Sequence, residues 1–163
     1  MRIAIVEDEE SATQELRVLF ARYGKENNME FSLDAFPDAL KFLASYRADY
    51  DLVMLDIEMP FMNGMEGAEK LRKLDPYVPI VFVTNMRRYA VAGYKVNAID
   101  FIIKPVEYYD FSTMLGRVRE LAILKKRRDH FGDFRRSNEK HSFFAHQVCG
   151  NIPSQAHVSY AQG

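Results

Sequence analysis

The sequence predicts an α/β fold built around a parallel sheet of five strands, and three observations support this prediction. Short apolar runs recur along the first 124 residues, segments with helical spacing of apolar residues follow them, and the two kinds of segment alternate five times. Continuous apolar runs are typical of parallel strands that helices cover on both faces. Strands and helices that alternate in this way form right-handed crossovers between parallel strands.

Five segments are expected to be strands. Residues 3–6, 52–55, 80–83 and 101–103 are continuously apolar, as strands buried on both faces are. Residues 31–36 alternate more between polar and apolar positions, which indicates an edge strand with one exposed face.

Five helices are predicted between and after these strands. The first follows two glutamates, with a candidate N-cap at Ser11, and the others are expected at residues 37–47, 64–74, 87–94 and 109–124. The helical pattern is weakest at 87–94. Five strands and five helices fit the flavodoxin-like doubly wound fold, a parallel sheet with the strand order 2-1-3-4-5.

Composition excludes several classes of protein. A hydrophobic content of 48% excludes disorder of the whole chain, and a single cysteine excludes a disulfide framework and a cysteine-based zinc site. No apolar run approaches the length of a membrane span, and the N-terminus does not have the pattern of a signal peptide. The expected location is therefore the cytoplasm, without membrane contact.

The charge distribution divides the chain after Leu124. The first 124 residues hold 15 Lys and Arg against 20 Asp and Glu, whereas residues 125–163 hold seven against three. All four histidines and the cysteine lie in this second part, which contains neither Leu nor Met. We expect one acidic domain at residues 1–124 and a basic, disordered tail or truncated linker at residues 125–163.

Polar residues follow the predicted strands at the point where each strand ends. Glu7 and Asp8 follow the first strand, Asp56 the third, Thr84 the fourth and Lys104 the fifth. In a doubly wound sheet, the ligand crevice lies outside the carboxyl ends of the strands. We therefore expect these five side chains to border one crevice.

Three carboxylates in one crevice repel one another, and a hard divalent cation such as Mg²⁺ relieves that repulsion. A nearby ammonium and hydroxyl suit the oxygens of a phosphoryl group, and a central carboxylate can act as the nucleophile that accepts this group. Phosphoryl transfer needs mainly positioning and neutralisation of charge. The sequence therefore predicts Mg²⁺-assisted phosphoryl chemistry on an aspartate.

These motifs closely resemble those of the bacterial response-regulator receiver domain, a signalling switch of two-component systems. The resemblance covers about residues 1–124 and lies in Val6-Glu7-Asp8-Glu9, Leu55-Asp56-Ile57-Glu58-Met59-Pro60, Asn63-Gly64, Val83-Thr84 and Asp100-Phe101-Ile102-Ile103-Lys104-Pro105. Residues 89–101 also resemble the LytTR-type (LytR/AlgR-like) subfamily, in which the receiver domain is joined to a DNA-binding output domain.

The resemblance implies that Asp56 accepts a phosphoryl group from a sensor histidine kinase. It also implies a Mg²⁺ cofactor, held by Glu7, Asp8, Asp56 and the backbone carbonyl of Glu58. Such a domain is a phosphorelay component and not an enzyme that acts on a metabolite.

The resemblance implies a switch as well. Thr84 would bond the phosphoryl group and shift inward, Phe101 would be the switch aromatic that follows it, and Lys104 would pair with a phosphoryl oxygen. The peptide bond before Pro105 would be cis. The face formed by the fourth helix, fifth strand and fifth helix would then change and serve for homodimerisation or for a partner.

Three positions differ from the residues that are usual in the family. Glu7 stands where Asp is more common, Glu58 places an acid two residues after Asp56, and Asn85 is larger than the small residue often found there. We expect Glu58 and Asn85 to influence the lifetime of the phosphoryl group.

The sequence leaves two other interpretations open. One is a Mg²⁺-dependent phosphohydrolase with Asp56 as nucleophile, although such enzymes usually carry a second aspartate where this chain has Glu58. The other is DNA binding through the basic tail.

A LytTR domain needs about 100 residues and 39 follow Leu124, so we expect a regulator truncated in its linker or continued out of frame. DNA binding is expected only where an output domain is restored.

Overall fold

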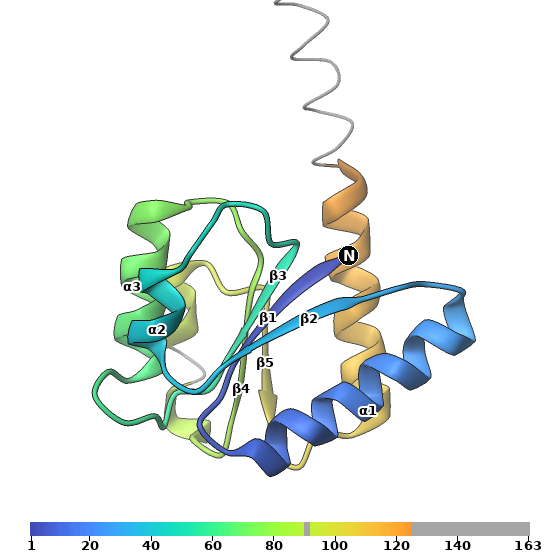
Figure 1. The fold of residues 1–163 in the computed structure, drawn as a ribbon, viewed down its shortest axis with the longest axis horizontal. Coiled ribbons are helices and arrows are strands. Elements are labelled where there is room, and N and C mark those ends of the chain that lie inside the picture. The colour runs from blue at the N-terminus through green and yellow to red at the C-terminus, as the bar shows by residue number, and fades with distance from the viewer. Residues whose placement is uncertain (90–91, 125–163) are drawn as a thin grey trace, which may run out of the picture. The chain divides into compact units, whose positions relative to one another are not determined.

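The computed structural model describes residues 1–89 and 92–124, which contain a parallel sheet (Figure 1). Its strands are β1 (Arg2–Val6), β2 (Ser32–Phe36), β3 (Leu52–Leu55), β4 (Ile80–Thr84) and β5 (Asp100–Ile103). All neighbouring strands are parallel, and their order is β2-β1-β3-β4-β5. The predicted flavodoxin-like topology and the edge position of the second strand are confirmed.

Residues Met1–Ala122 form one compact unit, and this unit contains the sheet. The predicted basic tail, residues 125–163, lies outside the described residues. Every helix within residues 1–89 and 92–124 is too short or too polar to cross a membrane.

Successive residues of the central strands pack into two cores on opposite faces of the sheet, because side chains alternate along a strand. In β1, Ile5 belongs to the core covered by α1 (Glu10–Asn27) and by the last helix, which the structure describes over residues 108–124. The next residue, Val6, belongs to the core on the other face. Both faces are thus covered, as the continuous apolar runs predict.

Aromatic packing joins α1 to the last helix. The rings of Phe20 and Phe111 meet edge to face with centroids 4.9 Å apart. Both side chains are almost completely buried, together with Met114 and Val118 one and two turns further along the last helix. This spacing of three and four residues is the reason that the last segment forms a helix against the sheet.

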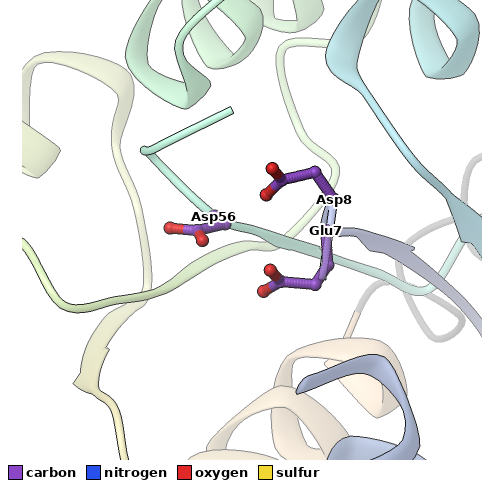
Figure 2. A group of neighbouring side chains, drawn as sticks. All are labelled: Glu7, Asp8 and Asp56. Atoms are coloured by element: carbon purple, nitrogen blue, oxygen red, sulfur yellow. The ribbon is translucent and has the colours of Figure 1, made fainter. Parts of the chain in front are cut away.

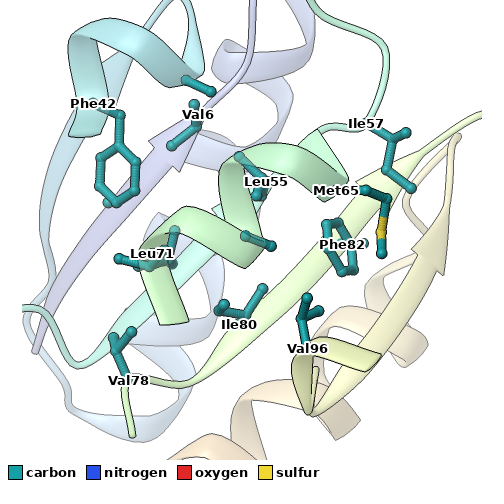
Figure 3. Packing of buried hydrophobic residues seen from close by; sticks show 14 of the residues in the cluster. Val6, Phe42, Leu55, Ile57, Met65, Leu71, Val78, Ile80, Phe82 and Val96 are labelled. Carbon is teal, nitrogen blue, oxygen red and sulfur yellow. The ribbon is translucent and has the colours of Figure 1, made fainter. Parts of the chain in front are cut away.

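The helices α2 (Ala39–Ala44) and α3 (Gly64–Leu74) cover the opposite face. Figure 3 shows Phe42 of α2 and Leu71 of α3 in the same apolar cluster as Leu55 of β3. The bounds of α3 agree with the prediction.

The register of the central strands aligns their carboxyl ends. Val6 of β1 pairs with Leu55 of β3, and Leu55 pairs with Phe82 of β4. The backbone N–H of Asp56 continues this ladder by donating to the carbonyl of Val6 at 3.0 Å. Glu7 and Asp56 are therefore neighbours at one edge of the sheet, although 49 positions separate them in the chain.

The predicted N-cap at Ser11 is wrong. The helix α1 begins at Glu10, and the N-cap is Glu9, whose extended backbone (φ −90°, ψ 114°) precedes the first turn. Ser11 lies inside that turn, where a hydroxyl cannot cap the free N–H groups of the helix start.

The second helix is shorter than the predicted range 37–47. It begins after Asp38, whose carboxylate caps it by accepting a hydrogen bond from the N–H of Lys41 at 2.7 Å. It ends before Ser45, whose hydroxyl donates to the carbonyl of Lys41 at 2.9 Å. Side-chain caps that compete with the helical ladder thus set both ends.

The predicted helix at 87–94 is replaced by two short 3₁₀ helices, η1 (Arg87–Tyr89) and η2 (Ala92–Val96). Residues 90–91 between them lie outside the described residues. Gly93 lowers the helix propensity of this segment, and Asn97 ends it with a left-handed backbone (φ 48°). The weak apolar pattern of the segment agrees with this outcome.

The aromatic pair between α1 and the last helix leads to a stability prediction. Phe111→Ala should lower the free energy of unfolding by about 3–5 kcal/mol, because it leaves a cavity in a closed core. Urea unfolding followed by circular dichroism measures the change. Tyr109→Ala, in the same helix and 78% exposed, is the matched control and should stay within about 0.5 kcal/mol of the original protein. Equal losses in both variants would contradict this account of the core.

Candidate functional site

Three carboxylates cluster at the carboxyl ends of β1 and β3. Glu7 and Asp8 follow β1, Asp56 follows β3, and one carboxylate oxygen from each lies within 4.8 Å of those of the other two. Figure 2 shows the three side chains extending toward the same side of the strand ends. Glu7 and Asp56 are buried, whereas Asp8 is exposed. The cluster is therefore open to solvent through Asp8.

A lysine from the end of β5 reaches into this cluster. The Nζ atom of Lys104 lies 2.7 Å from Oε2 of Glu7 and 2.8 Å from Oδ2 of Asp56. The Lys104 side chain is 12% exposed, so it forms a nearly buried bridge across three strand ends. Its peptide bond to Pro105 is cis, as the resemblance implies.

The Asp56 carboxylate is held through both oxygens. Its Oδ1 atom accepts hydrogen bonds from the backbone N–H groups of Ile57 at 2.6 Å and Glu58 at 3.2 Å. Its Oδ2 atom accepts from Lys104. Because backbone and side-chain donors approach from different directions, the orientation of this carboxylate is defined before any ligand binds.

Burial and neighbouring charges shift two pKa values in the site. Burial raises the pKa of Glu7, and the Asp56 carboxylate raises it further, although hydrogen bonding to Lys104 opposes both. Burial alone would lower the pKa of Lys104, but its hydrogen bonds to Asp56 and Glu7 outweigh burial and raise it. Lys104 therefore stays charged, and three carboxylates face one ammonium.

The donor set fits a hard divalent cation. Carboxylate oxygens are the ligands that Mg²⁺ prefers, and one or two of them with water are enough to hold it. Glu7, Asp8 and Asp56 supply three carboxylates, and a single ammonium leaves them with excess negative charge. This acidic triad is typical of the Mg²⁺ site of receiver domains.

Thr84 and Phe101 lie on β4 and β5, the neighbouring strands that end next to Lys104. Thr84 ends β4 fully buried, and its Oγ1 atom accepts a hydrogen bond from the N–H of Met86 at 3.2 Å. Its carbonyl accepts from the N–H of Lys104 at 3.0 Å. Phe101 is partly buried, and its ring centroid lies 5.9 Å from that of Phe82. Their roles in switching, and the Mg²⁺ ligation by the Glu58 carbonyl, stay predictions.

A close backbone approach at Gly64 is part of the site, and the prediction assigned it no role. A Cβ atom at this position would lie 1.9 Å from the carbonyl oxygen of Asp56, so only glycine fits. The N–H of Gly64 also donates to the carbonyl of Ile57 at 2.9 Å. The sequence held one signal for this close approach, namely a glycine directly after Asn63 within a predicted helix. Glycine in a helix costs stability, so its presence indicates that a side chain does not fit there.

Comparison with known proteins identifies the family. Residues 3–116 match the response regulator receiver domain family. The chain belongs to this family. It is therefore a receiver domain of two-component signalling, which is a switch rather than an enzyme that acts on a metabolite, and the phosphohydrolase interpretation is set aside.

The relatives of this receiver domain include regulators with longer chains. It is 35% identical over 125 residues to the sensory transduction protein LytR of Streptococcus agalactiae serotype V. The aligned region covers 76% of this chain and 50% of LytR. The receiver domain is 34% identical over 123 residues to the transcriptional regulatory protein YpdB of Escherichia coli K12, covering 74% and 47%. The chain thus spans about half the length of these curated relatives.

A solved structure gives the same relationship in three dimensions. The response regulatory domain of protein mrkE from Klebsiella pneumoniae superposes with a TM-score of 0.63 and 28% sequence identity. The match covers 78% of this chain and 99% of that domain.

The close approach at Gly64 can be tested by one methyl group. Gly64→Ala should lower the free energy of unfolding by about 1–3 kcal/mol, since the backbone of β3 or α3 must shift to admit the Cβ atom. Gly116→Ala is the matched control: apart from the backbone of its own helix and its chain neighbours, no atom of the described residues lies within 4 Å of its Cβ position. This control should gain about 0.5–1 kcal/mol from helix propensity. A neutral Gly64→Ala would show that the approach is not a constraint.

Proposed function

We propose that this chain is a phosphorylatable switch in a two-component phosphorelay. Its family implies a sensor histidine kinase as partner, and Asp56 is the proposed phosphoacceptor. The single observation that supports this assignment most strongly is that Asp56 lies beside two other carboxylates with a lysine 2.8 Å from one of its oxygens. A carboxylate oxygen of Asp56 would attack the phosphorus atom while the bond to the donor histidine breaks.

Mg²⁺ is the proposed cofactor, and Glu7, Asp8, Asp56 and the Glu58 carbonyl are its proposed ligands. When bound, the ion would neutralise charge that develops on the phosphoryl oxygens. Lys104 already contacts the Asp56 oxygen, and it would remain with the phosphoryl group once that oxygen is part of an acyl phosphate.

The proposed switch runs from Thr84 to Phe101. Thr84 would move to hydrogen-bond the phosphoryl group, and Phe101 would turn inward behind it. The affected surface would consist of η1, η2, β5 and the last helix, and it would serve for homodimerisation or for a partner. A bias of a few kcal/mol between two states is enough for such a switch.

We further propose a LytTR-type role in transcription regulation, in the cytoplasm. Support comes from the similarity to proteins named sensory transduction protein LytR and transcriptional regulatory protein YpdB. The receiver domain is placed at residues 1–124, with the tail or linker at residues 125–163. Contact with DNA would require an output domain joined to this receiver.

Phosphorylation by a small donor tests the proposal directly. With Mg²⁺ and acetyl phosphate, the protein should acquire one acid-stable, hydroxylamine-labile phosphoryl group, detected by a mobility shift and by mass. Asp56→Asn should abolish it, and removal of Mg²⁺ with EDTA should do the same. Asp110→Asn is the control, because it removes an exposed carboxylate of the last helix. Labelling that persists in Asp56→Asn, or repeated release of phosphate from phosphomonoesters, would contradict the proposal.

The lifetime of the phosphoryl group should depend on two exposed residues near the site, Glu58 and Asn85. Glu58→Asn should lengthen the half-life, because it removes an acid that can orient the attacking water. Asn85→Ala should shorten it, because a smaller side chain admits water more easily. A change of roughly threefold, equivalent to about 0.6 kcal/mol in the barrier, is expected. Decay of phosphorylated protein measures it, and unchanged lifetimes in both variants would refute the idea.

A further inference from the structure

Within residues 1–89 and 92–124, the outer edge of β2 presents backbone groups that no neighbouring strand pairs. Among the described residues, β2 has β1 as its only neighbouring strand. The N–H of Ser32 donates to the carbonyl of Met1, and the carbonyl of Phe36 accepts from the N–H of Glu7, both at 2.9 Å. Because alternate residues of a parallel strand bond to the same neighbour, the backbone groups of Leu33 and Ala35 point away from β1. Such an edge is a template for another strand.

One hollow flanks this edge on the face covered by α2. It has a volume of about 480 Å³ and is polar, with Arg2, Ser45, Arg47 and Tyr50 in its lining. The side chains of β2 that line it include Asp34.

A second hollow flanks the same edge on the face covered by α1. It has a volume of about 200 Å³, and Phe20, Met29 and Phe31 give it an apolar lining, with Arg17 and Lys25 also present. Leu33 lines both hollows. Figure 1 shows the position of β2 at the edge of the sheet, with α1 and α2 on its two sides. A strand added to β2 would therefore direct alternate side chains toward the two hollows.

The charged residues of the two linings are mostly basic, namely Arg2, Arg17, Lys25 and Arg47 against Asp34. Arg2 is itself neutralised, because its guanidinium lies 2.9 Å from Asp34 Oδ2 and also forms an ion pair with Asp49. The positive charge open to a ligand is therefore that of Arg17, Lys25 and Arg47. The first 124 residues as a whole carry more acidic than basic side chains. The basic β2 edge is thus a local exception that favours an acidic ligand.

We propose that the free edge of β2 binds an extended, acidic segment of a partner protein, which adds to the sheet as a further strand. The backbone of Leu33 and Ala35 would supply its hydrogen bonds, the mode known as β-augmentation. Acidic side chains of the segment would enter the polar hollow beside Arg47, and apolar ones would enter the hollow beside Met29. This surface lies apart from Asp56, and the inference goes beyond the phosphorelay role.

Charge argues against two other occupants. A second copy of β2 would bring two basic linings together. Residues 125–163 of this chain carry seven Lys and Arg against three Asp and Glu, so they would meet a surface of their own sign. An acidic segment from another protein meets no such repulsion.

The probe for this edge is a fluorescein-labelled, eight-residue peptide of alternating Glu and Val, titrated with the full chain and followed by fluorescence anisotropy. Saturable binding is expected. Ala35→Pro should weaken it at least tenfold, since proline removes an outward N–H without breaking a bond to β1 and is tolerated on edge strands. Ala35→Val, which keeps the N–H, should bind as the original chain does. Unfolding curves for both variants exclude loss of the fold as the cause.

Two further comparisons separate strand addition from simple charge attraction. The same peptide with N-methyl groups on alternate residues cannot complete the ladder and should lose at least tenfold in affinity. Arg47→Glu should also weaken binding, whereas the same charge change at exposed Arg119 of the last helix should not. Failure of the peptide to bind, or equal affinity with Ala35→Pro and with the methylated peptide, would overturn the proposal. Dimerisation of the chain that Ala35→Pro abolishes would overturn it too, because a second copy would then be the occupant.

Discussion

The arrangement at the carboxyl ends of the strands depends on the ion pairs that the ammonium group of Lys104 makes with Glu7 and Asp56. This group lies within 2.8 Å of Glu7 and of Asp56, whose side chains are 2% and 5% exposed. Two buried carboxylates side by side repel each other, and loss of the cation that bridges them would leave uncompensated buried charge, which costs about 3–5 kcal/mol in comparable sites. The same contact therefore stabilises the ends of β1, β3 and β5 and keeps the phosphoacceptor candidate oriented. A cation or a phosphoryl group that binds to Glu7 or Asp56 must change the contacts of these carboxylates with Lys104. Binding is thereby linked to the positions of β1, β3 and β5.

The carboxyl ends of the central strands and the outer edge of β2 differ in charge and suit different ligands. The carboxyl ends of the central strands gather Glu7, Asp8 and Asp56, and suit a divalent cation with an anionic group. The outer edge of β2 gathers basic side chains around an unpaired backbone, and suits an acidic strand. Both surfaces are products of one topology. The position of β1 next to β3 places Glu7 and Asp8 beside Asp56. The edge position of β2 leaves its outer backbone groups open among the described residues.

Local patterns were sufficient for the strands and for α3, and insufficient for several helix ends. The bounds of α3 were predicted from its strong apolar spacing, and the structure adds that Asn63 caps the helix by accepting from the N–H of Glu66. The ends of α2 depend on hydrogen bonds of Asp38 and Ser45, which compete with the helix and leave no mark in its apolar spacing. The segment 87–94 has little apolar periodicity and contains Gly93, and the structure has two 3₁₀ helices there instead of one α-helix.

By itself the sequence determined the alternation of strands and helices, and which polar residues follow each strand. Both depend on the apolar periodicity of a few neighbouring positions. Parallel strands then place their carboxyl ends together, so Asp56 and Lys104 were expected at one crevice. Only the tertiary structure decided that Lys104 bridges Glu7 and Asp56, and that the carbonyl of Asp56 lies too close to Gly64 for a Cβ atom. It also decided that basic side chains line the hollows beside the outer edge of β2. These contacts join residues far apart in the chain, and strand register and helix packing set their distances, which no local pattern specifies.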